Sequence, residues 1–478
     1  MRSYLATTLA GDGDSESDGT VLASGAPLEA SAVLSLPPEI LAEIFLRTQL
    51  EQATHRRTRE TPLLFGQVCL AWRAIAWFTP SLWSNVDFCL SEERYSVRTE
   101  LLDEWLQRSK AVPLTICIWS KEQEYGYWQS TMPTEMFRIL VSHSWHWKNV
   151  KLYVPHQWDG HLQPVRDNLP MLDTLHITHP TVAEHHRSFD MFENAPSLHE
   201  VHLIYVYVAE ITLPWHQITT FRGDRLYVDE CLKVLWYCPQ MKKCHFSPII
   251  GDYDLERTHL WPEALTHESL ERLDVTMTNA AIIDPFLDLC TLPALRHLRI
   301  GCNSRTEGAT VSITPVIQRS ACILEKLSME QAFQSEEEAI SCLQDIPSLV
   351  TLQMNIQSPK KISVKFLSAL SSTGKPLLPN LRSLRLEGSV SFNVEELTEM
   401  LVCRWTHPEI LSCPVSRLES LRVISSIDLA FSSGTEGYHC RLLEMVEDGL
   451  DLSIISGFDR ADVLKKMAIR IAEESNRS

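Results

Sequence analysis

The chain has 478 residues and a formal net charge of −18, with 44% hydrophobic and 22% charged residues. This length allows two or three ordinary domains or one long repeat array, and the composition indicates a soluble globular protein. The acidic balance argues against general nucleic-acid binding, which depends on Lys and Arg neutralising phosphates. No run of about eighteen apolar residues occurs, so we expect no membrane span.

Thirteen cysteines, an odd number, are scattered through apolar segments. In a chain of this size they indicate reduced, buried thiols rather than a disulfide framework, so we expect a cytoplasmic or nuclear protein. Residues 1–10 contain too few apolar residues to make a good secretory signal.

Residues 1–33 are small, acidic and poor in large apolar side chains, and we expect them to be disordered. The first predicted domain covers residues 34–88. Apolar residues between 36 and 45 recur at helical spacing behind two prolines, which suit the first turn of a helix. Between 64 and 76 the same spacing returns, and Pro80 ends the run. The pattern alone allows either a helical cap for the following domain or a helical surface that needs a partner.

The landmarks in this domain resemble an F-box. They are Leu36-Pro37-Pro38-Glu39-Ile40-Leu41, then Ile44-Phe45, then Val68-Cys69 with Trp72, and finally Pro80 followed by Leu82-Trp83. A polar stretch, 51–62, replaces the family's usual short connection. In that family the motif is a small helical domain that docks on the Skp-type adaptor of a cullin-RING ubiquitin ligase. The resemblance implies adaptor contacts by Leu36, Pro37, Ile40, Ile44, Phe45, Val68, Cys69 and Trp72.

Residues 89–145 connect this domain to a repeat array, with a helix expected over 95–109 and a strand over 114–119. Residues 146–430 contain a recurring pattern, L-x-x-L-x-[LIVM], at intervals that cluster around 25 to 29 residues. Two degenerate copies lie at 147–152 and 241–246, and a doubtful one at 218–223 has glycine in its last position. The clear copies are 169–177, 195–203, 267–275, 292–300, 321–329, 346–354, 378–386 and 415–423.

The pattern and its spacing fit leucine-rich repeats of the longer, helix-containing class. Each unit is predicted as a strand followed by a helix, and neighbours must stack because one unit alone leaves an apolar face exposed. The expected fold class is therefore α/β: a small all-α head, then a solenoid with parallel strands on its concave face and helices on its convex face. Residues 431–478 are expected to cap the array with a strand over 450–455 and helices at 442–447 and 461–474.

We expect no catalytic residue, metal site or cofactor. The sequence contains no nucleophile elbow, phosphate-binding loop or dinucleotide fingerprint. None of the eighteen histidines has the spacing that places two ligands and a base on one helix face, and the cysteines between 231 and 244 form no C-x-x-C pair. An enzyme with unrecognised chemistry is the least favoured alternative.

The repeats offer a better candidate site. Their leucines should point inward, while the residues alternating with them face the concave surface. This places Arg272, His297, Arg299 and Lys326 in one patch, which suits carboxylate or phosphate oxygens. Neighbouring acids, Asp274, Glu325 and Glu330, could instead neutralise it. The candidate client-binding residues are Arg272, His297, Arg299, Lys326, Gln353, Arg385 and Arg422.

Head and repeats together predict a non-catalytic subunit of an SCF-type ubiquitin ligase. The resemblance implies that the head binds the Skp-type adaptor and, through it, the cullin and RING subunits, while the repeats bind a client protein for ubiquitination. The client is expected to be acidic or phosphorylated, and neither nucleic acid nor membrane is expected as a partner. The alternative is a scaffold or inhibitor that acts outside a ubiquitin ligase, with the head serving only as a cap.

Overall fold

The chain divides into two compact units, Met1–Leu82 and Trp83–Ser478. The computed structural model describes residues 36–51, 61–120, 133–179, 188–250, 264–278, 283–302, 311–333, 335–357, 360–372, 374–406, 415–425, 436–457 and 461–465. The tail predicted over 1–33 and most of the 51–62 interruption lie outside these ranges.

The described part of the first unit is helical, with an aromatic core. The Phe45 ring stacks on Phe65 at 4.1 Å between centroids and lies 4.8 Å from the ring of Trp72. Cys69 caps the third helix, where its thiol accepts the backbone N–H of Trp72 at 3.4 Å. The helices are α1 (Pro38–Glu51), α2 (Thr61–Val68) and α3 (Leu70–Phe78), followed by the 3-10 turn η4 (Pro80–Trp83), which ends at the first residue of the second unit.

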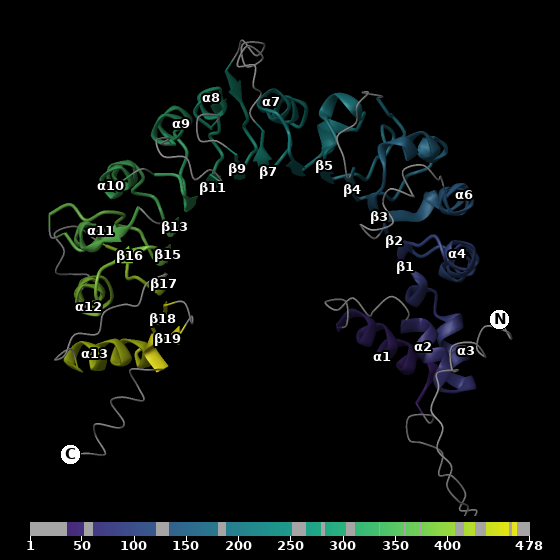
Figure 1. The fold of residues 1–478 in the computed structure, drawn as a ribbon, viewed down its shortest axis with the longest axis horizontal. Coiled ribbons are helices and arrows are strands. Elements are labelled where there is room, and N and C mark those ends of the chain that lie inside the picture. The colour runs from purple at the N-terminus through teal and green to yellow at the C-terminus, as the bar shows by residue number, and fades with distance from the viewer. Residues whose placement is uncertain are drawn as a thin grey trace, which may run out of the picture. The chain divides into compact units, whose positions relative to one another are not determined.

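In the described residues, the second unit is built on one long open sheet of fifteen strands (Figure 1). Consecutive strands of this sheet pair in parallel, except for the last pair, which is antiparallel. Its strands are β1 (Asn85–Leu90), β2 (Leu114–Ser120), β3 (Trp147–Tyr153), β4 (Thr174–Thr178), β5 (Glu200–Ile204), β6 (Thr220–Asp224), β7 (Lys243–Ile249), β9 (Arg272–Met277), β11 (His297–Cys302), β12 (Lys326–Glu330), β13 (Thr351–Ile356), β15 (Ser383–Gly388), β17 (Ser420–Ser425), β18 (Asp451–Ser456) and β19 (Ala461–Asp462).

Two short parallel pairs accompany this sheet: β8 (Leu265–Thr266) with β10 (Cys290–Thr291), and β14 (Ile362–Ser363) with β16 (Val390–Ser391). Within the second unit, Figure 1 shows the strands of the long sheet on the inner side and the helices on the outer side. The helices are α4 (Tyr95–Ser109), α6 (Thr134–Ser142), α7 (Val228–Tyr237), α8 (Ile283–Asp288), α9 (Thr314–Ser320), α10 (Glu336–Gln344), α11 (Val364–Leu370), α12 (Val394–Leu401) and α13 (Glu436–Glu447). This arrangement is an α/β, solenoid-like fold.

Several connections depart from the predicted strand-then-helix unit. The connections from β3 to β4 and from β5 to β6 contain 3-10 turns in place of α-helices, and η7 carries Pro164 within it. Proline removes a backbone donor that an α-helix needs, which accounts for the tighter turn of η7. These segments are η7 (His156–Val165), η8 (Val208–Glu210) and η9 (Trp215–Gln217); η6 (Ser144–His146) precedes β3, and a π-helical turn, η12 (Val402–Thr406), extends α12.

Two inward rows of side chains form the core beneath the sheet. One row runs in register from Ile116 on β2 to Leu452 on β18, and the second lies two residues further along each strand. Gly223 interrupts the second row on β6. A Cβ there would lie 2.4 Å from the Leu226 side chain and 2.8 Å from the Phe221 ring, so these two side chains already fill the position. β6 pairs with β5 and β7, so the doubtful repeat at 218–223 does form a strand of the sheet.

The ends of the sheet differ from the predicted boundaries. β1 lies partly within the 34–88 segment that the sequence assigned to the head, but it pairs with β2 and belongs to the second unit. At the other end, α13 and β18 lie where a helix and a strand were expected. Residues 461–462, predicted to begin a charged helix, instead form β19 against β18, because their backbone groups pair with its edge. The helix begins two residues later, and its described part is residues 463–465. Residues 466–474 lie outside the described ranges. Among the residues that the structure describes, no helix is long and apolar enough to cross a bilayer.

Candidate functional site

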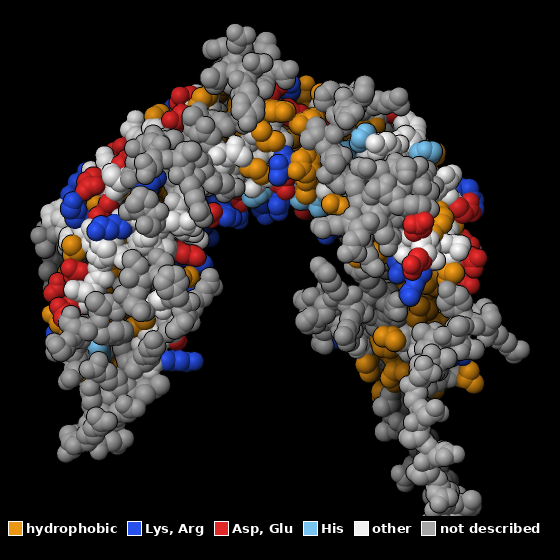
Figure 2. All heavy atoms as spheres, viewed as in Figure 1, with side chains coloured by type: hydrophobic (Ala, Val, Ile, Leu, Met, Phe, Trp, Pro, Cys, Tyr) orange, Lys and Arg blue, Asp and Glu red, His pale blue; other side chains and the backbone are white. Residues whose placement is uncertain are grey.

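The first candidate surface lies on α1, where two apolar stripes run side by side. Leu41 and Phe45 are 3% and 1% exposed, whereas Ile40 and Ile44 are 49% and 44% exposed. A helix needs only one stripe for its own core, so the second is excess apolar surface. Figure 2 shows hydrophobic side chains at the surface of the three helices. The other large apolar side chains exposed on this unit are Leu36, Leu64, Val68, Leu70 and Phe78.

The structure divides the predicted adaptor-binding residues into two groups. Leu36, Pro37, Ile40, Ile44 and Val68 are exposed. Phe45 is not: its ring is buried between helices, where it stacks on Phe65. Cys69 and Trp72 are half-buried and stabilise the start of α3 and the aromatic core.

The second candidate surface is formed by two outward rows on the long sheet. Because the strands are parallel and in register, residues at equivalent positions of neighbouring strands lie beside one another. From β3 to β17, the first outward row is Asn149, Thr174, Glu200, Thr220, Lys243, Arg272, His297, Lys326, Thr351, Ser383 and Ser420. The second is Lys151, His176, His202, Arg222, His245, Asp274, Arg299, Ser328, Gln353, Arg385 and Arg422.

The predicted patch is brought together by this register. Arg272 pairs with His297, and His297 pairs with Lys326, while Arg299 lies two residues beyond His297 on the same strand. The other candidate client-binding residues lie further along: Gln353 is on β13, Arg385 on β15 and Arg422 on β17. Figure 2 shows Lys and Arg side chains gathered on the inner side of the second unit.

Three of these arginines are already bound to carboxylates. Nη2 atoms of Arg272, Arg299 and Arg385 lie 2.8 Å from Asp274, 2.6 Å from Glu330 and 2.9 Å from Glu387, respectively. Burial alone raises the pKa of Asp274, but the nearby His245 and the hydrogen-bonded Arg272 outweigh it and bring the pKa below its usual value. The predicted neutralisation by acids is therefore real for the arginines. Glu325 differs, since it pairs with Arg296 at 2.5 Å.

A histidine pair occupies the second row toward β4. His176 and His202 stack with their ring centroids 3.9 Å apart. Asp224 lies 3.4 Å from Nε2 of His202 and 3.3 Å from the Arg222 guanidinium. Burial, followed by His202 and the cations Lys151 and Arg222, lowers the pKa of His176 to about 4. The His176 ring is therefore neutral at pH 7 and adds an aromatic face rather than charge.

On the strands with degenerate or doubtful repeats, four basic outward-row residues were not among the predicted client-binding residues. Lys151, Arg222, Lys243 and His245 lie on β3, β6 and β7, the three strands whose repeats are degenerate or doubtful. Their alternation with buried residues is the same as in the clear repeats, and reading the degenerate copies in the same register would have found them.

The described residues hold no group of three or more metal-binding side chains. Burial raises the pKa of Cys238 and Cys290 to about 12, and that of Cys231 and Cys244 well above the usual range. These four are thiols rather than thiolates at pH 7, and the thiolate is the nucleophilic form.

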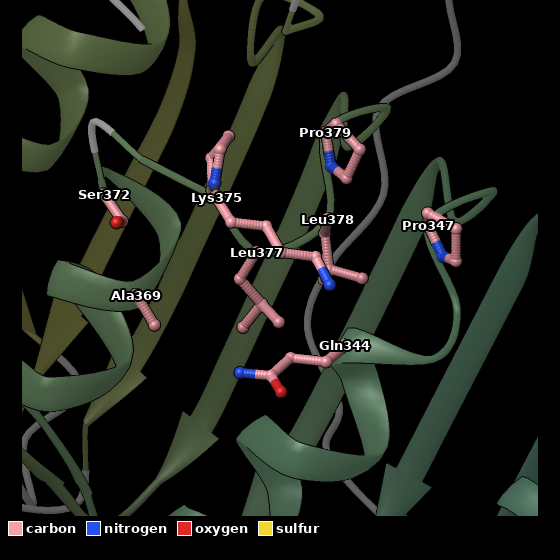
Figure 3. Close-up of a pocket in the computed structure, with 9 residues that line it drawn as sticks. Gln344, Pro347, Ala369, Ser372, Lys375, Leu377, Leu378 and Pro379 are labelled. Carbon is pink, nitrogen blue, oxygen red and sulfur yellow. The ribbon is translucent and has the colours of Figure 1, made fainter. Parts of the chain in front are cut away.

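A pocket of about 400 Å³ lies between the ends of α10 and α11 and the turn that leads into β15 (Figure 3). Its walls are mostly apolar, and its polar side chains are those of Gln344, Ser372 and Lys375. Among the lining residues that the structure describes, none is an acid, a histidine or a cysteine.

Comparison with known proteins leaves the chain without an assigned family. No family model matches the sequence, and no curated protein matches it either. Among solved structures, a protein from Bacteroides fragilis matches with a TM-score of 0.28 and 12% identity, over 66% of this chain and 70% of that one. The class supported by the fold is therefore no finer than an α/β protein with a long parallel, solenoid-like sheet.

Proposed function

We propose that the protein is a non-catalytic client receptor of an SCF-type ubiquitin ligase, with an F-box head joined to leucine-rich repeats. The observation that carries this proposal is the exposed stripe of Ile40 and Ile44 on α1. These positions belong to the landmarks that resemble an F-box, and their side chains are available because Leu41 and Phe45 form the core instead. Exposed apolar surface of this kind is typical of a protein-binding site.

The second unit supports the other half of the proposal. Its inward rows repeat leucine and similar residues at the same register on successive strands, as leucine-rich repeats do. Its outward rows are polar and, apart from the buried Asp274, at least partly accessible, which suits a client surface. The receptor would contribute no reacting group; it would hold the client's lysines near the ubiquitin-carrying enzyme and so raise their effective concentration.

Co-purification with the Skp-type adaptor tests the head. We expect the wild-type chain to retain the adaptor and the double variant Ile40→Asp/Ile44→Asp to lose it, since two carboxylates cannot be buried against an apolar partner. Glu43→Ala is the matched control on the same helix: its carboxylate pairs with Arg47 at 2.8 Å, and both side chains are exposed.

Two results would contradict the ligase proposal: failure of the wild-type chain to retain the adaptor, or retention by the double variant. Either result would favour a repeat scaffold that acts outside a ubiquitin ligase. Circular dichroism of each variant checks that the helices remain folded.

A further inference from the structure

Four basic side chains lie side by side in the first outward row, and we call them the basic row: Lys243 on β7, Arg272 on β9, His297 on β11 and Lys326 on β12. Neighbouring strands are about 4.8 Å apart, so the row spans about 14 Å across the sheet. The whole chain carries a net charge of −18, which makes this a local reversal of sign.

The two ends of the basic row differ from its middle. Arg272 is held by Asp274 through three hydrogen bonds of 2.8 to 3.2 Å. Within the described residues, by contrast, neither Lys243 nor Lys326 has a carboxylate within 4.0 Å, and both side chains are exposed. The row therefore ends in two ammonium groups that are free to bind an anion.

His297, which lies between Arg272 and Lys326 in the basic row, is close to the positive charges of both. Burial lowers the pKa of His297, and the charges of Lys326 and Arg272 lower it further, against smaller opposite effects of Glu325 and Asp274. A neighbouring carboxylate or phosphoryl group would relieve this repulsion.

We propose that the basic row binds an extended acidic segment of a partner polypeptide, laid across the strands so that anionic groups reach Lys243 and Lys326. A segment of four or five extended residues covers about 14 Å, which matches the row. A polypeptide fits better than a nucleic acid because Asp274 and Glu330 lie among the basic groups and would repel a continuous line of phosphates. The inference rests on the proposed client-receptor function and specifies the chemistry of the client.

Fluorescence anisotropy with the full chain and labelled octapeptides tests the proposal. The probes are octaglutamate, octaglutamine, and a serine-glycine octapeptide with and without phosphates on its serines. We expect micromolar binding of octaglutamate, of the phosphopeptide or of both, and none of the uncharged peptides. The variant Lys243→Glu/Lys326→Glu should weaken binding at least about tenfold, because two attractions become repulsions.

The matched control is Lys361→Glu/Lys365→Glu, which changes the net charge equally at two exposed positions. Lys361 directly precedes β14, and Lys365 lies on α11. Binding by octaglutamate alone would show that the basic row recognises carboxylates. Binding by the phosphopeptide alone would show that it recognises phosphoryl groups. The proposal is overturned if neither peptide binds, if both double variants weaken binding equally, or if a twelve-nucleotide single strand binds more tightly than the peptides.

The Ile40→Asp/Ile44→Asp variant should bind these peptides as the wild type does. Failure of adaptor co-purification and failure of peptide binding therefore remain separate results.

Discussion

The protonation of the Glu230 side chain affects the stability of the second unit. Its carboxylate accepts the backbone N–H groups of Val208 at 2.9 Å and Tyr227 at 3.3 Å. Burial nevertheless raises its pKa from 4.5 to about 7. The folded state therefore binds a proton more tightly than the unfolded state, so stability should fall as the pH rises from 4.5 through 7.

We expect this carboxyl to cost the second unit up to about 3 kcal/mol between pH 4.5 and pH 8. Urea unfolding across that range measures the slope, and Glu230→Gln should flatten it because the amide does not titrate. Glu268→Gln, at an exposed position, should leave the slope as it is. An unchanged slope in Glu230→Gln would contradict the assignment.

At the same scale, part of the candidate site could be predicted from residue types alone. Strand alternation placed Arg272 and Asp274 on one face, two residues apart, and the structure joins them at 2.8 Å. The partner of Arg299 is Glu330 on the next strand, and its contact depends on the register between strands as well as on spacing. In the head, spacing alone could not show which apolar residues are buried and which are exposed, because the stripe that contains Phe45 and the stripe that contains Ile44 have the same helical period.

Among the elements, β15 ends at a position that only glycine accepts. Gly388 has a φ of +106°, and a Cβ there would lie 2.0 Å from the carbonyl oxygen of Ile356 on β13. We expect Gly388→Ala to destabilise the second unit by about 2 kcal/mol or more, through the clash and the left-handed backbone together.

Gly301→Ala provides the control within the same sheet. Gly301 lies on β11 with no positive φ, and its Cβ would meet only ordinary contacts of 3.5 Å with Glu330 and Thr276. Its effect should stay within about 0.5 kcal/mol. Thermal unfolding of both variants checks the prediction, which equal destabilisation by the two substitutions would contradict.

The strands were easier to predict from the sequence than the connections. Alternation with buried leucines located β9, β11, β12, β13 and β15, because each strand buries the same face. β6 was difficult to predict because Gly223 stands where the pattern expects a large apolar residue. Only the structure shows that the Leu226 and Phe221 side chains fill that position. The 3-10 turns between β3 and β6 were also missed, because short turns have no period to detect.

For the whole molecule, the division into two units predicts that damage to one core leaves the other folded. Gly66 packs under Trp77, where a Cβ would lie 2.3 Å from the ring, so Gly66→Ala should loosen the helices of the first unit. Hydrogen exchange should rise across residues 38–78 and stay unchanged in β9 to β15, because repeat arrays are stabilised mainly by contacts between neighbouring repeats. Adaptor retention should fall while octaglutamate affinity persists. Faster exchange in both units would show that their stabilities are coupled.

The antiparallel pairing of β19 also affects how the protein behaves at high concentration. A long parallel sheet that ended on a bare strand would present a row of unpaired N–H and C=O groups, to which the edge of another copy could add. β19 reverses direction and pairs with β18 at Ile455 and Ser456, so it occupies part of that edge with backbone of the opposite polarity. A strand arriving in the parallel sense would have to displace it. The reversal therefore opposes end-to-end polymerisation of the sheet at this edge.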